Sequence, residues 1–487
     1  MNFVSYEFLL FFPLVLVLYW WLPSQYRWII LLLASYFFYL YWNPWTMPLL
    51  LGTSFISYIA ARKIARGESK KQRDLWLIFA LVVCLGCLII FKYLGFITEN
   101  TLGVLQFFGA PVNDVVLNII LPVGISFYTF QTLSYVIDVY RGDISHETHF
   151  GYYALFISFF PQLVAGPIER PGHLLPQLHM PKVFKATNLI TGLHLMLRGF
   201  FKKLVIADYL AKFVDVVYGA PTKASGPGIL IATVLFAFQI YCDFSGYSDI
   251  AVGTAKMMGI QLMKNFNNPY SATSVQDFWR RWHISLTDWF ADYIYKPLGG
   301  NRKGGRRHAR NILIVFLISG AWHGASWTYI IWGGIHGIYL VVENLWKNYS
   351  EGHRESQPTY MSQMAKRLIT FAFVCFAWLF FRGNSLGDVG VLLGKLWSEW
   401  SIDDFASTFI MMQLGITDMI RMILMFLCLQ LFDKEQFSPE YKSEDDATLQ
   451  GSAGSALIIF KMITIITLAW LSLVSVNASS SFIYFQF

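Results

Sequence analysis

The chain has 487 residues, of which 55% are hydrophobic, 18% are aromatic and only 14% are charged, and its net charge is +7. Soluble globular proteins carry roughly 25% charged residues, so this chain has too few charges to cover a water-facing surface of its size. The apolar residues come in long blocks, and about 20 of them suffice to cross a bilayer as a helix. The composition therefore excludes a soluble domain and predicts an integral membrane protein.

Taken in chain order, the apolar blocks predict an all-α integral membrane fold with roughly 11–13 transmembrane or re-entrant helices. We expect one membrane-embedded domain over residues 1–487, because no polar stretch is long enough to fold alone. Residues 433–455 are rich in charged and small residues, which predicts an exposed, flexible loop. The candidate spans are about 6–22, 28–43, 46–61, 75–96, 117–139, 150–166, 187–206, 226–250, 311–330, 331–346, 367–382, 418–432 and 456–475.

Two short basic segments predict the orientation of the chain. They read RKIARGESKKQR at 62–73 and RKGGRRHAR at 302–310. Basic loops between apolar spans lie on the cytoplasmic side, and three spans precede the first segment, so the N-terminus is predicted to lie outside. The same placement argues against nucleic acid as a partner, because a nucleic-acid surface would not be confined to such loops.

Two carboxylates close the apolar block at 226–250. Asp243 and Asp249 stand in QIYCDFSGYSDI, at 239–250. Carboxylates at membrane depth are costly without partners. They indicate either a helix that ends at the membrane interface, or the wall of a polar cavity or a hydrogen-bond partner for a histidine. The sequence does not decide between these interpretations.

The stretch 265–300 is polar and aromatic, and a helix is predicted from Ser274 to Tyr295. Tryptophan and tyrosine beside arginine suit the headgroup level of a membrane, so one interpretation is an interfacial anchor helix. The other is a helix that lines a pocket near the cytoplasmic side, where Arg280, Arg281 or Lys296 meets an anionic donor. The residues alone support both equally.

A histidine is predicted to lie deep in the membrane. His323 follows Arg310 by 13 residues, which is roughly 20 Å along a helix. An ionisable residue at that depth is a functional candidate, although a histidine that hydrogen-bonds neighbouring helices is the plainer alternative. His336 follows after 13 more residues and would face another side of one continuous helix, so the two share a pocket only if the helix breaks. No third ligand at a metal-binding spacing is evident, so no metal is predicted.

Five segments of the chain stand out together. They are PVGISFYTFQTLSYVIDVYRG (122–142), FFPQLVAGPIER (159–170), YCDFSGYSDIAVG (241–253), NFNNPYSATSVQDFWRRWHISLTDWFADYIYKPLGGNR (265–302) and AWHGASWTYIIWGGIHG (321–337). In this order they resemble the membrane-bound O-acyltransferase (MBOAT) superfamily, in its bacterial alginate O-acetyltransferase branch. The resemblance is strong over 1–350 and weak over 351–487. The chain shows no Walker loop, G-x-S-x-G elbow or dinucleotide fingerprint that would favour another enzyme class.

The resemblance implies a ring of tilted helices around a membrane-embedded funnel. It implies that His323 is the catalytic histidine and that His283 is the second characteristic one; His336 matches a recurring position without an assigned role. It further implies a cytoplasmic thioester donor, either acyl-CoA (acetyl-CoA) or an acylated carrier protein, with no permanently bound cofactor. The acceptor is an exported polysaccharide or a partner, such as an extracytoplasmic SGNH-type acyltransferase, at the bacterial cytoplasmic membrane.

On this hypothesis His323 is the general base toward an acceptor hydroxyl, which requires the neutral imidazole that burial favours. His283 would orient the acceptor or bind near the thioester. Water would be excluded by Trp279, Trp282 and Trp322, and donor phosphates would meet Arg280 and Arg281. The predicted donor site therefore consists of Arg280, Arg281, Trp279, Trp282 and Lys296. One alternative is a transporter or flippase for a lipid-linked sugar, with His323 and Asp243 as a proton relay. Another is a non-catalytic scaffold that docks an extracytoplasmic enzyme.

Overall fold

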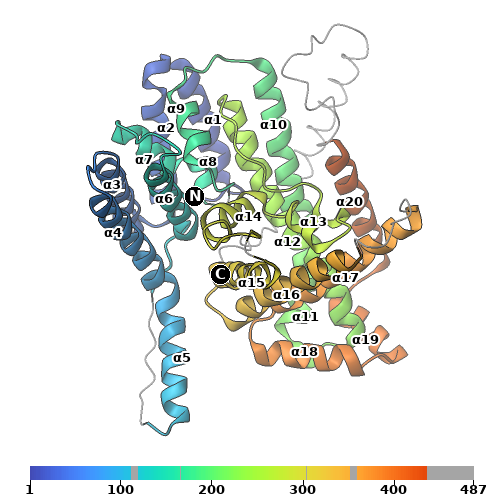
Figure 1. Cartoon of the computed structure of the whole chain (residues 1–487). Helices are drawn as coiled ribbons and strands as arrows, with labels where there is room; N and C mark the ends of the chain where they lie inside the picture. Colours follow the sequence, from blue (N-terminus) through green and yellow to red (C-terminus); the bar gives the residue numbers. More distant parts are fainter. Residues whose placement is uncertain (111–118, 165, 303, 351–358, 436–487) are drawn as a thin grey trace. The chain divides into compact units, whose positions relative to one another are not determined.

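The computed structural model describes residues 1–110, 119–164, 166–302, 304–350 and 359–435 (Figure 1). Within these ranges every regular element is a helix, which confirms the predicted all-α class. The predicted span at 456–475 and nearly all of the predicted loop at 433–455 lie outside the described residues.

The chain divides into two compact units, one of residues 1–193 and 251–263, the other of residues 194–250 and 264–487. Two helices, α10 (Ala186–Phe200) and α12 (Gly226–Met257), contribute to both. The remaining helices of the first unit are α1 (Tyr6–Trp21), α2 (Arg27–Trp42), α3 (Met47–Ala65), α4 (Lys70–Leu88), α5 (Leu94–Phe107), α6 (Ile125–Arg141), α7 (Phe150–Ser158), α8 (Phe160–Leu163) and α9 (Pro171–His179), with the short elements η1 (Ser24–Tyr26), η2 (Pro44–Thr46) and η3 (Ile89–Tyr93).

The first unit packs around the small-residue face of α3. Ser57 and Ala61 are fully buried there, which lets neighbouring helices come close. The Ser57 hydroxyl lies 2.7 Å from the hydroxyl of Tyr153 on α7, so α3 and α7 are tied by a buried hydrogen bond. The α4 helix begins at Ser69, whose side chain accepts a hydrogen bond from the backbone N–H of Gln72 as an N-cap.

The second unit contains α11 and α13 to α20, and its functional part is a helical hairpin of α15 and α16. The two helices run side by side, joined by a three-residue turn at 324–326 (Figure 1). A Cβ at Gly320 would lie 2.3 Å from the Tyr329 carbonyl oxygen, and a Cβ at Gly333 would lie 2.1 Å from that of Phe316. Only glycine allows this close approach. The helices are α11 (Asp208–Gly219), α13 (Val275–Trp279), α14 (Ile284–Phe290), α15 (Gly305–His323), α16 (Trp327–Ser350), α17 (Tyr360–Arg382), α18 (Leu386–Ser398), α19 (Ile402–Met412) and α20 (Ile416–Glu435), with η4 (Phe201–Ala207), η5 (Pro221–Lys223), η6 (Pro269–Ser271) and η7 (Ala291–Tyr295).

Three of the described helices are long and apolar enough to cross a membrane, or four if the pair α19 and α20, bent by 79°, forms one span. The three are the continuous helix Lys70–Phe107, α12 and α17. Only 17% of the apolar window of Lys70–Phe107 is buried in protein, against 78% for α12. The first therefore exposes an apolar surface that suits lipid, whereas α12 lies within the protein. Most other predicted spans form helices that are shorter or less uniformly apolar.

Candidate active site

The last residue of α15 is His323, which the hairpin turn holds inside the second unit. Its side chain is buried, with 3% exposure. Three aromatic rings contact the imidazole edge to face: Trp322 at 5.0 Å, Trp332 at 4.9 Å and Phe381 at 5.5 Å between ring centroids. These rings come from α15, α16 and α17 respectively. The histidine thus sits in an aromatic enclosure, which excludes water from the imidazole.

The break between α15 and α16 brings His336 into the same enclosure. The imidazole of His336 is fully buried and lies 5.1 Å from the Trp332 ring, which also contacts His323. The Trp279 Nε1–H donates a hydrogen bond of 3.3 Å to His336 Nδ1. The sequence predicted that the two histidines share a pocket only if the helix breaks between them. The structure has such a break at residues 324–326.

The predicted continuous helix from Ser274 to Tyr295 is wrong, because the chain breaks at His283. It forms α13, α14 and the π-helical segment η7 in succession. His283 has a positive φ of 43°, which is uncommon outside glycine and often marks a functional position. Asn265 supports the break: its backbone carbonyl accepts from the Ile284 N–H at 2.9 Å, and its side-chain oxygen accepts from the Ser285 hydroxyl at 2.6 Å.

His283 extends the array of histidines. Its side chain is fully buried, and its ring lies 4.6 Å from Phe244 and 6.1 Å from Trp322. His283 lies at the break, outside the membrane-length helices, and burial lowers its pKa to about 3, so it is neutral at physiological pH. We call the three histidines with the tryptophan rings between and beside them the histidine cluster: His283, Trp322, His323, Trp332, His336 and Trp279.

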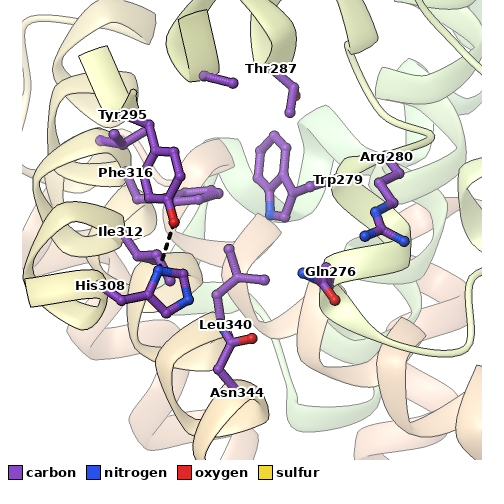
Figure 2. A pocket seen from close by; sticks show the side chains of 12 residues that line it. Gln276, Trp279, Arg280, Thr287, Tyr295, His308, Ile312, Phe316, Leu340 and Asn344 are labelled. Atoms are coloured by element: carbon purple, nitrogen blue, oxygen red, sulfur yellow. Dashed lines mark hydrogen bonds between the residues drawn. The ribbon is translucent and has the colours of Figure 1, made fainter. Parts of the chain in front are cut away.

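A pocket opens beside the histidine cluster, between α13, α14, η7, α15 and α16. It has about 760 Å³ of empty volume, its open mouth included. Figure 2 shows a hydrogen bond between the Tyr295 hydroxyl and His308 Nδ1 on one side of the pocket, and Arg280 on the other side. The two atoms of this hydrogen bond are 2.7 Å apart. The pocket combines an apolar wall with a polar rim. The lining residues are Gln276, Trp279, Arg280, Thr287, Ala291, Tyr295, His308, Ile312, Val315, Phe316, Leu340 and Asn344.

Two of the five predicted donor residues, Trp279 and Arg280, line this pocket. The other three have different surroundings. Arg281 forms an ion pair of 2.8 Å with Asp277, and Lys296, which is exposed, pairs with Asp292 at 2.5 Å. Trp282 packs in the aromatic core, 5.1 Å from the Trp378 ring. Their predicted donor role stays a prediction.

The pocket is separated from His323 by side chains of its own wall. His323 is not among the residues that line it. Trp279 and Phe316 line the pocket and also contact the His336 ring, at 5.0 and 6.3 Å. Trp279, His336 and Trp332 therefore stand in a chain of ring contacts between the pocket and His323.

Sequence reasoning missed Trp332 and the polar rim of the pocket. Trp332 stands four residues before His336, and this spacing, which places both on one helix face, is a signal that could have identified it. His308 lies in the basic segment at 302–310. The arginines and lysine of that segment predict the orientation of the chain, and nothing in the segment marks the histidine as a pocket residue. No local signal distinguishes Tyr295 or Asn344.

Asp243 and Asp249 do not end a helix, because α12 continues to Met257. They belong to a buried ion-pair network with cations from α10 and η4. Lys203 lies 2.7 Å from both Asp243 and Asp208, and Arg198 donates two hydrogen bonds to Asp249 at 2.8 and 3.0 Å. The helix-end interpretation is therefore wrong. The network consists of Arg198, Lys202, Lys203, Asp208, Asp243 and Asp249.

A glycine contact lets these charges meet inside the protein. A Cβ at Gly199 would lie 2.4 Å from the backbone oxygen of Gly246, so α10 and α12 approach backbone to backbone. Three cations and three carboxylates face one another there, which balances the network. Buried charges are tolerated when paired in this way.

The protein is all-helical in the ranges that the structure describes, with a histidine buried at a hairpin tip and a pocket on the far side of the aromatic rings. Residues 140–386 match the family described as MBOAT, the membrane-bound O-acyltransferase family. The chain belongs to this family. It is a multi-pass membrane-bound O-acyltransferase that uses an acyl donor, which favours the enzyme over the transporter and scaffold alternatives.

Curated relatives agree with the family and differ in their substrates. The chain is 34% identical over its whole length, and over the whole relative, to the probable alginate O-acetylase AlgI of Pseudomonas putida. It is 39% identical to the peptidoglycan O-acetyltransferase of Helicobacter pylori, over 73% of this chain and 71% of the relative. It is 30% identical to the teichoic acid D-alanyltransferase of Bacillus subtilis, over 55% of this chain and 70% of the relative. These proteins act on different polymers, so they leave the acceptor open.

The described residues contain no group of three or more His, Cys, Asp or Glu side chains placed to hold a metal ion.

Proposed function

We propose that the protein transfers an acetyl group from a cytoplasmic thioester across the membrane to a hydroxyl of an exported cell-surface polysaccharide or of a partner acyltransferase. The observation that carries this proposal is His323, buried in an aromatic enclosure at the hairpin tip. Two of the relatives named above are O-acetyl-transferring by name, which supports acetyl as the group that is moved.

The histidine acts as a general base in this proposal. Neutral His323 takes the proton of the acceptor hydroxyl, and the oxygen attacks the thioester carbonyl carbon. The C–S bond then breaks, and the leaving thiolate takes the proton back from the imidazolium. An ester and a free thiol result, without a covalent acyl-enzyme. The aromatic rings around His323 keep water from competing as the acceptor.

The pocket beside the cluster supports a donor that enters from the side of residues 302–310. Arg280 stands at its rim, where a phosphate of acetyl-CoA or of a carrier-bound phosphopantetheine would meet it. This direction agrees with the predicted cytoplasmic placement of the basic segment, and so with an N-terminus outside the cell. A ring of helices around a funnel, in the bacterial cytoplasmic membrane, would give the acceptor its path from the other side.

The acceptor side calls for a partner. An extracytoplasmic SGNH-type acyltransferase, or another polysaccharide-modification protein, would receive the acetyl group and pass it to the polymer. The protein also has membrane lipid as a neighbour in this proposal, because the helix Lys70–Phe107 exposes an apolar face.

The test is a transfer assay with purified protein in proteoliposomes. Acetyl-CoA labelled in the acetyl group is supplied on one face, and alginate or peptidoglycan fragments on the other, with and without an extracytoplasmic SGNH-type acyltransferase beside the fragments. We expect labelled ester on the acceptor and a stoichiometric amount of free CoA thiol. Passage of a lipid-linked sugar without ester formation would contradict the proposal and restore the transporter alternative.

A further inference from the structure

Two hydrogen-bond donors stand together on one face of α16. Trp332 and His336 are four residues apart, which places their side chains on the same side of the helix. Their rings lie 5.1 Å apart, and both side chains are fully buried. The Trp332 ring also lies 4.9 Å from the imidazole of His323, so the pair adjoins the proposed general base.

The hydrogen bond from Trp279 determines which nitrogen of His336 carries the proton. An indole N–H is a donor only, so the nitrogen that accepts it, Nδ1, has no proton of its own. Neutral His336 therefore has its proton on Nε2. The two ring nitrogens point in diverging directions, so the Nε2–H is directed away from Trp279. Both Trp332 Nε1 and His336 Nε2 are thus N–H donors.

Neither donor is used by the part of the chain that the structure describes. Among the residues that the structure describes, Trp332 Nε1 and His336 Nε2 have no hydrogen-bond partner, although both atoms are buried. A buried donor without an acceptor is costly, and such groups in native proteins call for an explanation, often a catalytic one. Aromatic rings enclose the pair, among them Phe278, Phe316 and Trp378, so bulk water does not take the place of the acceptor.

We propose that Trp332 Nε1–H and His336 Nε2–H are the donors that hold the carbonyl oxygen of the acyl thioester during transfer. This inference rests on the proposed function. When the acceptor oxygen attacks the carbonyl carbon, the C=O electron pair moves onto the carbonyl oxygen, and the two N–H groups stabilise that charge. When the pair returns to re-form the C=O bond, the C–S bond breaks and the thiolate leaves with the proton from His323. Toward this oxygen Trp279 is a positioning residue, because it determines the tautomer of His336.

Trp332→Phe is the central test, because it removes one N–H and keeps an aromatic ring. Proteins with a single such donor removed lose about 10²–10³-fold in kcat. We expect a loss of that size with little change in the KM for acetyl-CoA. Trp289→Phe is the matched control: Trp289 of α14 is buried against Phe290 and Tyr293, outside the histidine cluster. A kcat for Trp332→Phe equal to that of Trp289→Phe would overturn the proposal.

Two variants of His336 distinguish the role of its N–H as a hydrogen-bond donor from the role of its ring in packing. Gln offers an N–H donor and an oxygen that accepts from Trp279, whereas Phe offers neither. We expect His336→Gln to retain at least tenfold more kcat than His336→Phe. Equal kcat in two well-folded variants would contradict the role of the N–H.

A measurement without these variants covers the case in which they fail to fold. Acetyl-CoA labelled with ¹³C at the carbonyl is bound to His323→Ala, and its C=O stretch is recorded by isotope-edited infrared spectroscopy. Donation by two N–H groups shifts the stretch to lower frequency than in water-free solvent; an unshifted band overturns the inference. If wild-type protein transfers no acetyl group at all, the proposed function fails, whereas normal transfer by Trp332→Phe refutes only the donor pair.

Discussion

The ion-pair network and the histidine cluster are both buried in the second unit, but they treat their polar groups in opposite ways. In the network each carboxylate faces a cation within about 3 Å, as between Lys203 and Asp243 at 2.7 Å. In the histidine cluster aromatic rings surround the imidazoles, and two N–H donors have no acceptor among the described residues. Removing one partner from a buried ion pair destabilises a fold, whereas an unused donor is available to a substrate. We therefore expect the first region to govern stability and the second to govern rate.

His323→Ala gives the largest expected effect on the rate. Loss of a general base lowers turnover by about 10²–10⁴-fold, because the acceptor hydroxyl then attacks without giving up its proton to a positioned group. Initial rates of transfer from labelled acetyl-CoA measure this. The melting temperature should stay close to that of wild type. His146→Ala, in the loop at 142–149 between α6 and α7, is the control for loss of an imidazole. Turnover by His323→Ala at the control rate would remove His323 from the mechanism.

Lys203→Met should have the largest effect on stability. It leaves Asp208 and Asp243 as buried charges without their shared cation, which costs about 3–5 kcal/mol. A thermal melt of the detergent-purified protein, in which size-exclusion chromatography measures the folded fraction at each temperature, would show the loss of stability. The rate per folded molecule should stay at the wild-type value.

A companion variant checks that charge imbalance causes this loss. Combining Lys203→Met with Asp208→Asn and Asp243→Asn removes the two carboxylate charges that Lys203 offset and should recover a large part of the stability. If Lys203→Met instead melts like wild type but transfers slowly, the network belongs to the reaction, and the contrast between the two regions fails.

The two regions also differ in how far the sequence could reveal them. The lengths of the apolar blocks predict the membrane class, and the W-H-G segment singles out His323 as a candidate. The network was not predicted, although Arg198, Lys202 and Lys203 interrupt one apolar block and Asp243 and Asp249 another. Complementary charges in two separate spans are a usable signal, but only the glycine contact between Gly199 and Gly246 shows that the spans meet.

The break at His283 lay beyond sequence reasoning for a local reason. Helical periodicity runs through residues 274–295 without a glycine or proline, which are the usual signs of a break. The chain turns because Asn265, distant in sequence, binds the backbone of Ile284 and the side chain of Ser285. By contrast, the α15–α16 turn carries a glycine, Gly324, and the prediction missed its position by only a few residues.

The burial of His283 leads us to expect a moderate loss of folding stability at acid pH. Its folded-state pKa of about 3 lies below the ordinary value of 6.5, so the unfolded chain binds a proton more readily than the folded protein. The stability that neutral His283 allows is complete above about pH 6.5 and is lost as the pH falls toward 3. Between pH 7 and pH 5 this amounts to about 2 kcal/mol for this residue.

Thermal unfolding at several pH values would measure the effect. His283→Asn removes the titrating group and keeps a residue that tolerates positive φ. The variant should lose less stability than wild type between pH 7 and pH 5. Parallel pH profiles for the two proteins would show that His283 is charged or hydrated in the folded state, which is incompatible with a neutral histidine cluster.

The smallest effect is expected on the KM for acetyl-CoA, and it should differ between the neighbouring residues Arg280 and Arg281. Arg280 lines the pocket and is exposed, whereas Arg281 already pairs with Asp277 at 2.8 Å. Arg280→Gln should raise the KM for acetyl-CoA about fivefold, or about 1 kcal/mol, because a solvent-exposed ion pair with a phosphate is weak. The rise should shrink at high salt, since salt screens exposed charges, and kcat should not change. Arg281→Gln should raise the KM less. A larger rise for Arg281 would mean that the donor displaces Asp277 and approaches α13 from its other face, and the pocket in Figure 2 would then not be the donor site.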